Sequence, residues 1–126
     1  MNKRFPTILF IGALALVAVF YNYQDIVFKR PQSVHKWRQS DCASIALNYY
    51  QGGMNLRNSE THNLTSDGGT SGKSLTSEVP ILYFAVAALY HLFGYHDYIY
   101  RIFNTLLFFL GLFFLFRLMR FILKDT

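Results

Sequence analysis

The residues best suited to chemistry lie in a polar segment between two hydrophobic stretches. The segment opens with His35-Lys36-Trp37-Arg38-Gln39-Ser40-Asp41 and closes with Ser77-Glu78-Val79-Pro80. It places one carboxylate, Asp41, soon after the first hydrophobic stretch, and another, Glu78, at the start of the next. Ionisable side chains held against a bilayer are costly and usually functional. The pattern therefore points to chemistry next to a membrane surface.

Each of these side chains has a functional and an ordinary interpretation. Asp41 suits a general base or a ligand for a phosphate-bound cation, and Arg38 suits a phosphate clamp because its guanidinium is a planar fork of donors. His35 and Trp37 could line a pocket or simply settle into the membrane interface. Alternatively, Arg38 and Asp41 form an i,i+3 ion pair, and Glu78 is a first-turn carboxylate favoured by the helix dipole. No ligand cluster demands a metal, although a divalent cation beside carboxylates and phosphate is compatible with the sequence.

Two other kinds of site are excluded. The loop ending in Gly72-Lys73-Ser74 invites comparison with a nucleotide-binding loop, but the template needs glycine where this chain has Asp67. The net charge of +5 comes mainly from basic residues that flank hydrophobic stretches. That distribution favours contact with lipid headgroups, and no basic stripe interleaved with aromatics predicts nucleic-acid binding.

Three hydrophobic stretches must position the polar segment. Of the 126 residues, 52% are hydrophobic and only 15% charged, and the apolar residues gather at about 5–23, 79–94 and 98–118. The first stretch would span about 28 Å as a helix, and it lacks the small-x-small site that a cleaved signal peptide needs. The second is short enough to be a buried core helix instead. We expect an all-α integral membrane protein with three transmembrane helices and a loop over 24–78.

The loop itself is predicted to carry a helix from about Val34 to Gln51, which Gly52-Gly53 would end. At about 100° per residue it has an apolar side and a polar side. The apolar side would lie on lipid or on a neighbouring span, and the helix is too short to cross a bilayer, so it is expected along the surface. The rest of the loop, residues 52–77, is expected to be irregular. The polar side carries Arg38, Asp41, Ser44 and Asn48.

The order of these motifs resembles a known family. His35 to Asp41, Asn48 to Asn55 and Ser77 to Pro80, set between hydrophobic stretches, look like the amino-terminal part of bacterial membrane glycosyltransferases. These enzymes belong to the dolichyl-phosphate-mannose-protein mannosyltransferase-like family, of the C-type fold. The likeness extends over nearly the whole chain, through the Gly94 to Arg101 connection and the Phe/Leu-rich third stretch.

The resemblance implies an enzyme that transfers a sugar from a polyprenyl-phosphate carrier to an acceptor, either lipid, glycan or protein. It implies that Asp41 is the catalytic base towards the acceptor hydroxyl and that Glu78 lines the same cleft. From their side chains we add Arg38, His35, Trp37 and Asn48 as substrate-binding residues, with Arg38 on the lipid phosphate. Family members are several times longer, so the chain is expected to be a fragment that is inactive alone.

The resemblance also implies a multi-pass protein of the cytoplasmic membrane, with the loop on the extracytoplasmic side. Lys3 and Arg4 mildly support a cytoplasmic amino terminus, whereas Arg117, Arg120 and Lys124 favour the opposite orientation. One alternative function is a small membrane-anchored interaction protein whose loop does no chemistry. Another is a domain secreted after signal cleavage.

Overall fold

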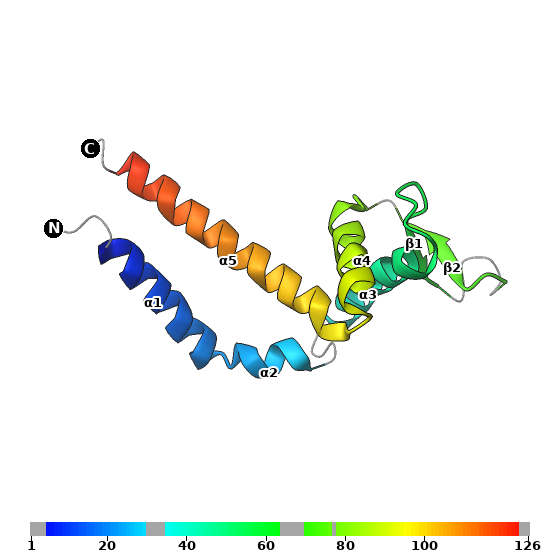
Figure 1. Ribbon diagram of the computed structural model, residues 1–126, viewed down its shortest axis with the longest axis horizontal. Coiled ribbons are helices and arrows are strands. Elements are labelled where there is room, and N and C mark those ends of the chain that lie inside the picture. The colour runs from blue at the N-terminus through cyan, green and yellow to red at the C-terminus, as the bar shows by residue number, and fades with distance from the viewer. Residues whose placement is uncertain (1–4, 30–34, 64–69, 77, 124–126) are drawn as a thin grey trace. The chain divides into compact units, whose positions relative to one another are not determined.

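The structure is a computed structural model that is mostly helical, as the sequence predicts. The chain divides into two units, residues 1–30 and 31–126. The described part holds five helices and one small sheet (Figure 1). The described residues are 5–29, 35–63, 70–76 and 78–123.

The first unit contains one helix within the span predicted over 5–23 and a second helix in the connection expected after it. Helix α1 covers Phe5–Phe20 and helix α2 covers Tyr23–Phe28. The break falls at Asn22, whose backbone is left-handed, with φ 52°, a conformation that asparagine tolerates better than most residues. The Asn22 side chain donates a 2.7 Å hydrogen bond to Asp25 in the first turn of α2. As a result, α1 has 16 residues and a length of about 24 Å.

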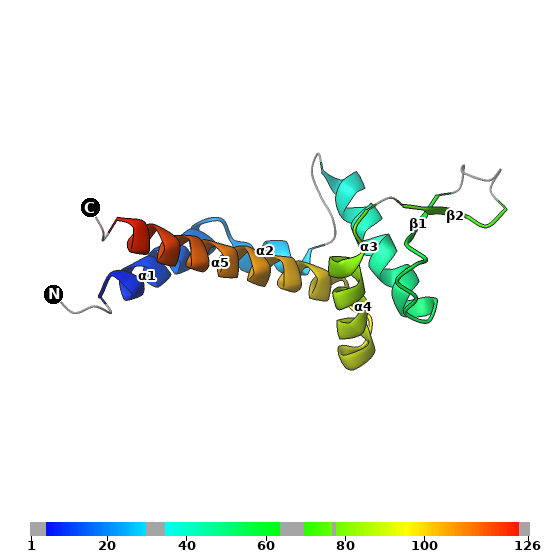
Figure 2. The ribbon, with the colours of Figure 1, turned by 90° about the horizontal axis from the view of Figure 1, so that it is seen from above.

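The second unit is built in layers. Its elements are α3 (Lys36–Gln51), β1 (Glu60–His62), β2 (Lys73–Leu75), α4 (Ile81–Phe93) and α5 (Asp97–Ile122). The hairpin of β1 and β2 packs on α3, α3 packs on α4, and α4 contacts the start of α5. Figure 2 shows α5 leaving this stack on the side away from the hairpin, with α4 running crosswise to it.

The core of the second unit lies between α3 and α4. Ala46 of α3 and Val86 and Ala87 of α4 are fully buried, and their small side chains let the two helices approach closely. Larger side chains surround them, with Tyr49 and Phe84 in edge-to-face contact at 5.7 Å. The predicted helix over 34–51 is confirmed as α3. Of the side expected to face lipid or a neighbouring helix, Ala46 is in the core and Tyr50 packs against it, but the buried face also includes Ile45, which the sequence placed beside the polar side. The buried apolar residues are Ile45, Ala46, Tyr49, Tyr83, Val86, Ala87, Tyr90 and Ile99.

The hairpin corrects the expectation that residues 52–77 are irregular throughout. Its two strands are antiparallel, with Glu60 opposite Leu75 and His62 opposite Lys73. Each strand has three residues and is mostly polar, so neither shows the apolar alternation that identifies a strand in a sequence. Of the glycine-rich stretch that the sequence analysis compared with a nucleotide-binding loop, residues 67–69 lie outside the described part.

The three predicted spans differ in length. In the described residues, only α5 is long and apolar enough to cross a membrane. With 26 residues it extends about 39 Å, and no residue of its most apolar window is buried. Helix α4 has 13 residues, or about 20 Å, and ends at Gly94, where φ is 81°. One side of α4 is core, in line with the alternative interpretation of residues 79–94, and its other side exposes Ile81, Leu82, Leu92 and Phe93.

Candidate functional site

The two ends of the polar segment meet at the start of α4. Arg38, in the first turn of α3, forms an ion pair from Nη1 to Oε1 of Glu78. The other carboxylate oxygen of Glu78, Oε2, accepts a hydrogen bond from the hydroxyl of Tyr83. The backbone N–H of Glu78 donates to Oγ1 of Thr76 at 3.1 Å, which orients the turn before α4. Glu78 is therefore held at its backbone and at both carboxylate oxygens.

Tyr83 connects this ion pair to two other helices. Its side chain is buried, and its hydroxyl lies 3.4 Å from Sγ of Cys42 on α3. Its ring stacks on that of Tyr100 in α5, with centroids 6.5 Å apart and planes inclined by 10°. The position of Glu78 is consequently coupled to the packing of α3, α4 and α5 together.

The electrostatics keep Arg38 fully charged. The Glu78 carboxylate raises the pKa of the Arg38 guanidinium above its ordinary value. The Arg38 side chain is 66% exposed, whereas that of Glu78 is 27% exposed. An exposed ion pair of this kind contributes little to stability. Its importance lies in where it places a permanent positive charge.

Asp41 lies one helical turn after Arg38 and is partly exposed. The sequence allows an ion pair between the two, but Arg38 pairs with Glu78 instead. No hydrogen bond or ion pair joins Asp41 to another residue in the described ranges. Residues three apart share a helix face, so Asp41 and Arg38 flank the same surface. This leaves the Asp41 carboxylate available to accept a proton from a ligand.

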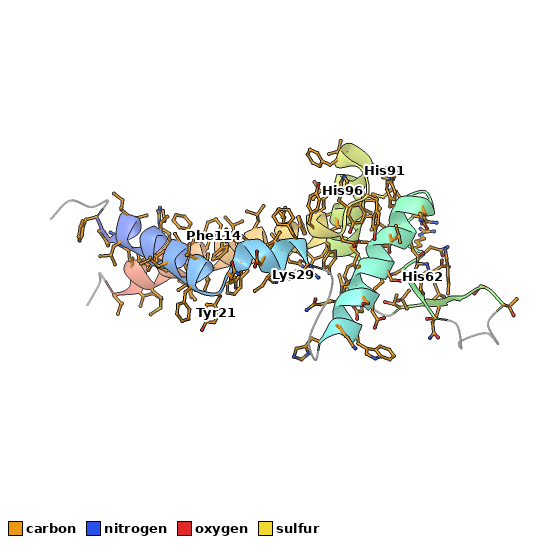
Figure 3. The ribbon with its side chains drawn as sticks, turned by 90° about the horizontal axis from the view of Figure 1, so that it is seen from below. Tyr21, Lys29, His62, His91, His96 and Phe114 are labelled. Atoms are coloured by element: carbon orange, nitrogen blue, oxygen red, sulfur yellow. The ribbon has the colours of Figure 1, made fainter. Side chains whose placement is uncertain are left out.

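Asn48 has a different place from the one predicted for it. It is only 5% exposed, and its Nδ2 donates a 2.8 Å hydrogen bond to the backbone oxygen of Glu60 in β1. One turn earlier on α3, Oγ of Ser44 accepts a 2.7 Å hydrogen bond from the backbone N–H of His62. The same oxygen lies 2.8 Å from Nδ1 of the His62 ring. Figure 3 shows His62 on the hairpin beside α3. Asn48 therefore attaches the hairpin, and burial keeps it out of the candidate ligand site.

We predict that Asn48→Ala loosens the hairpin from α3. The change leaves the partly buried Glu60 carbonyl without its partner, at a cost of about 1–3 kcal/mol. Faster amide hydrogen exchange at residues 60–62 would report the loosening. The matched control is Asn58→Ala, because Asn58 is exposed in the turn that its own backbone N–H closes with Asn55. Equal exchange in both variants would contradict the attachment role.

The remaining predicted ligand-binding residues lie at the start of α3. His35 is its N-cap and Trp37 is in its first turn, and both are exposed. They stand on the surface near Arg38 rather than inside a pocket. The site offers few oxygen ligands for a divalent cation, because one carboxylate oxygen of Glu78 is bound to Arg38 and the other to Tyr83. Within the described ranges, no group of three or more His, Cys, Asp or Glu side chains is arranged to hold a metal ion.

Sequence reasoning missed Tyr83 and Cys42. Tyr83 looks like one more aromatic residue of a hydrophobic helix, and Cys42 gives no signal as a single cysteine. The only available hint was the position of Tyr83, one turn and a half after Glu78. In comparisons with family models, curated proteins and solved structures, the chain shows no significant match. The candidate site therefore depends on the chain's own residues.

Proposed function

We propose that the chain is part of a longer membrane enzyme that transfers a sugar from a polyprenyl-phosphate carrier to an acceptor outside the cytoplasmic membrane. The observation that carries the proposal is the meeting of Arg38 and Glu78 one turn from Asp41. A fixed cation beside an available carboxylate is what a transfer from phosphate to a hydroxyl needs. The resemblance of the motifs to the glycosyltransferase family supplies the substrate class.

The layers of the second unit support a position at the membrane surface. If α5 crosses the bilayer, the crosswise α4 lies in the plane of the interface, with its exposed apolar side towards lipid (Figures 1 and 2). The α3 layer then lies just above, and the polar hairpin faces water. In this arrangement the first turn of α3 is at the level of lipid headgroups. We propose α1 as a second span, and α4 as an interfacial helix in place of the span expected over 79–94.

Tyrosine and histidine side chains at the junction of α4 and α5 fit this arrangement. His91 lies in the last turn of α4 and His96 is the N-cap of α5 (Figure 3). The ring of His91 packs on that of Tyr50 with centroids 4.7 Å apart, and the ring of His96 stacks on that of Tyr98 at 5.0 Å. Aromatic side chains with a polar edge favour the membrane–water interface. The junction would thus fix the depth at which α5 enters the bilayer.

The proposed chemistry uses two side chains directly. Asp41 accepts the proton of the acceptor hydroxyl as its oxygen attacks the anomeric carbon of the sugar. The bond between that carbon and the phosphate oxygen breaks, and the polyprenyl phosphate leaves with the bonding electrons. Arg38 stabilises the charge that develops on the leaving phosphate. Glu78 and Tyr83 hold Arg38 in position.

Cys42 offers a direct test of the proposed orientation because it is the chain's single cysteine and adjoins Asp41. In right-side-out membrane vesicles, we expect a membrane-impermeant maleimide to label Cys42 without permeabilisation. Labelling of the protein in denaturing detergent gives the total amount of reactive cysteine. A Cys42→Ser chain carrying Leu123→Cys, at the far end of α5, is the matched reporter and should react only after permeabilisation. The reverse pattern would overturn the proposed location of the site.

A further inference from the structure

Two carboxylates share the surroundings of one guanidinium. Glu78 is in contact with Arg38, and Asp41 stands on the same face of α3 one turn away. Tyr83 fixes the Glu78 carboxylate through its second oxygen, so this negative charge cannot simply swing away. Lys36 precedes Arg38 by two positions and so points to another side of the helix. The site therefore combines one positive charge, on Arg38, with two negative charges, on Glu78 and Asp41.

The ion pair leaves part of Arg38 unused. It joins one terminal nitrogen, Nη1, to one oxygen of Glu78. A guanidinium has five N–H donors in a planar fork, and this one is largely exposed. A phosphate oxygen can therefore bind the remaining donors while Glu78 stays in place, and Glu78 then acts on the phosphate as a fixed neighbouring charge.

We propose that Glu78 is a specificity-determining residue that makes the Arg38 site prefer a singly charged phosphodiester to a doubly charged phosphomonoester. This inference rests on the proposed function. A carrier-linked sugar is a phosphodiester with one negative charge. The carrier phosphate left after transfer is a monoester, whose second ionisation lies near pH 6. The additional charge of the product meets repulsion from Glu78 and Asp41, so the same site that holds the donor favours release of the product.

The test compares two lipids that differ only at the phosphate. Farnesyl phosphate is the monoester probe and methyl farnesyl phosphate is the diester probe, each titrated at pH 8 and low salt into the full chain in neutral phosphatidylcholine nanodiscs. We expect the wild type to bind the diester more tightly. Glu78→Gln keeps the side chain's shape and removes its charge, and it should improve monoester binding relative to diester binding by about fivefold.

Two controls make the result specific. Glu60→Gln is the same chemical change at another partly buried carboxylate, which pairs with Lys73 in the hairpin, and it should leave the ratio of the two affinities unchanged. Raising the salt concentration to about 1 M shortens the screening length to about 3 Å, so the effect of Glu78→Gln should largely disappear there. A shift that survives high salt would contradict an electrostatic origin.

Arg38→Gln separates this inference from the proposed function. If Arg38→Gln weakens binding of both lipids but Glu78→Gln leaves their ratio unchanged, the selectivity proposal is overturned and the phosphate site stands. If Arg38→Gln alters the binding of neither lipid, Arg38 is not a phosphate contact, and both proposals for the site fall together.

Discussion

Replacing Asp41 with Asn is expected to lower the rate of sugar transfer by about 10²- to 10⁴-fold, which is the usual contribution of a general base. The amide keeps the size of the side chain but cannot accept the hydroxyl proton. Because Asp41 forms no ion pair with Arg38, the substitution should leave the Arg38–Glu78 contact intact. The loss should therefore appear in the rate of transfer with little change in the affinity for the lipid carrier.

Transfer is measured in membranes with the longer parent enzyme that contains this chain, using a radiolabelled sugar on a polyprenyl-phosphate carrier. Asp25→Asn is the matched control, because Asp25 is an exposed carboxylate of α2 in the other unit, and we expect it to keep wild-type activity. Asp41→Glu should recover only part of the rate, since a displacement of about 1 Å can cost about 10²-fold.

Normal transfer by Asp41→Asn would reject Asp41 as the base. Absence of transfer by the wild-type protein itself would favour the alternative in which the chain is a membrane-anchored interaction protein whose loop does no chemistry. A variant that loses transfer and also fails to enter the membrane would instead reveal a structural role for Asp41, so membrane insertion is measured in the same samples.

Ile45→Ala is expected to destabilise the second unit by about 2–5 kcal/mol. Ile45 is 2% exposed in the core cluster that α3 and α4 share, and truncation leaves a cavity that the packed helices cannot fill. Such a loss is a large part of the total stability of a small domain. We expect a clear decrease in the unfolding temperature, measured by the loss of helical circular dichroism on heating in detergent.

The matched control is Ile81→Ala. Ile81 is the same residue type in α4 but is 66% exposed on its outer side, and in detergent its truncation should change the free energy of unfolding by no more than about 0.5 kcal/mol. If the two variants have the same transition temperature, the α3–α4 contact does not form the core of the unit.

Several parts of the fold follow from local sequence. Helix α3 ends where the sequence has Gly52-Gly53, and Gly53 has the positive φ that suits glycine. The long apolar run after Gly94 becomes α5. These features depend on neighbours along the chain, and so their signal is present in the sequence. The break at Asn22 is also local, although an asparagine in an apolar run gives only a weak warning of it.

The contacts between helices and strands that are far apart in the chain could not be predicted from local sequence. Spacing puts Arg38 and Asp41 on one face of α3, but only the packing of α3 on α4 brings Glu78 to Arg38. Asn48 sits on the polar side of α3, yet the hairpin that buries it comes from strands too short and too polar to predict. In the same way, the sequence could not decide whether residues 79–94 cross the membrane or form a core helix, because that depends on whether their apolar side chains contact lipid or α3.

Composition and periodicity were enough to predict the helix over 34–51 and the apolar helix after Gly94, with a polar segment between hydrophobic stretches. The packing of distant segments was needed to show that Glu78 is bound at both carboxylate oxygens, that Tyr83 is one of its partners, and that Asp41 is left without an ion pair to Arg38. The reason is physical: periodicity fixes which face a side chain occupies, whereas its partner depends on which distant segment packs against that face.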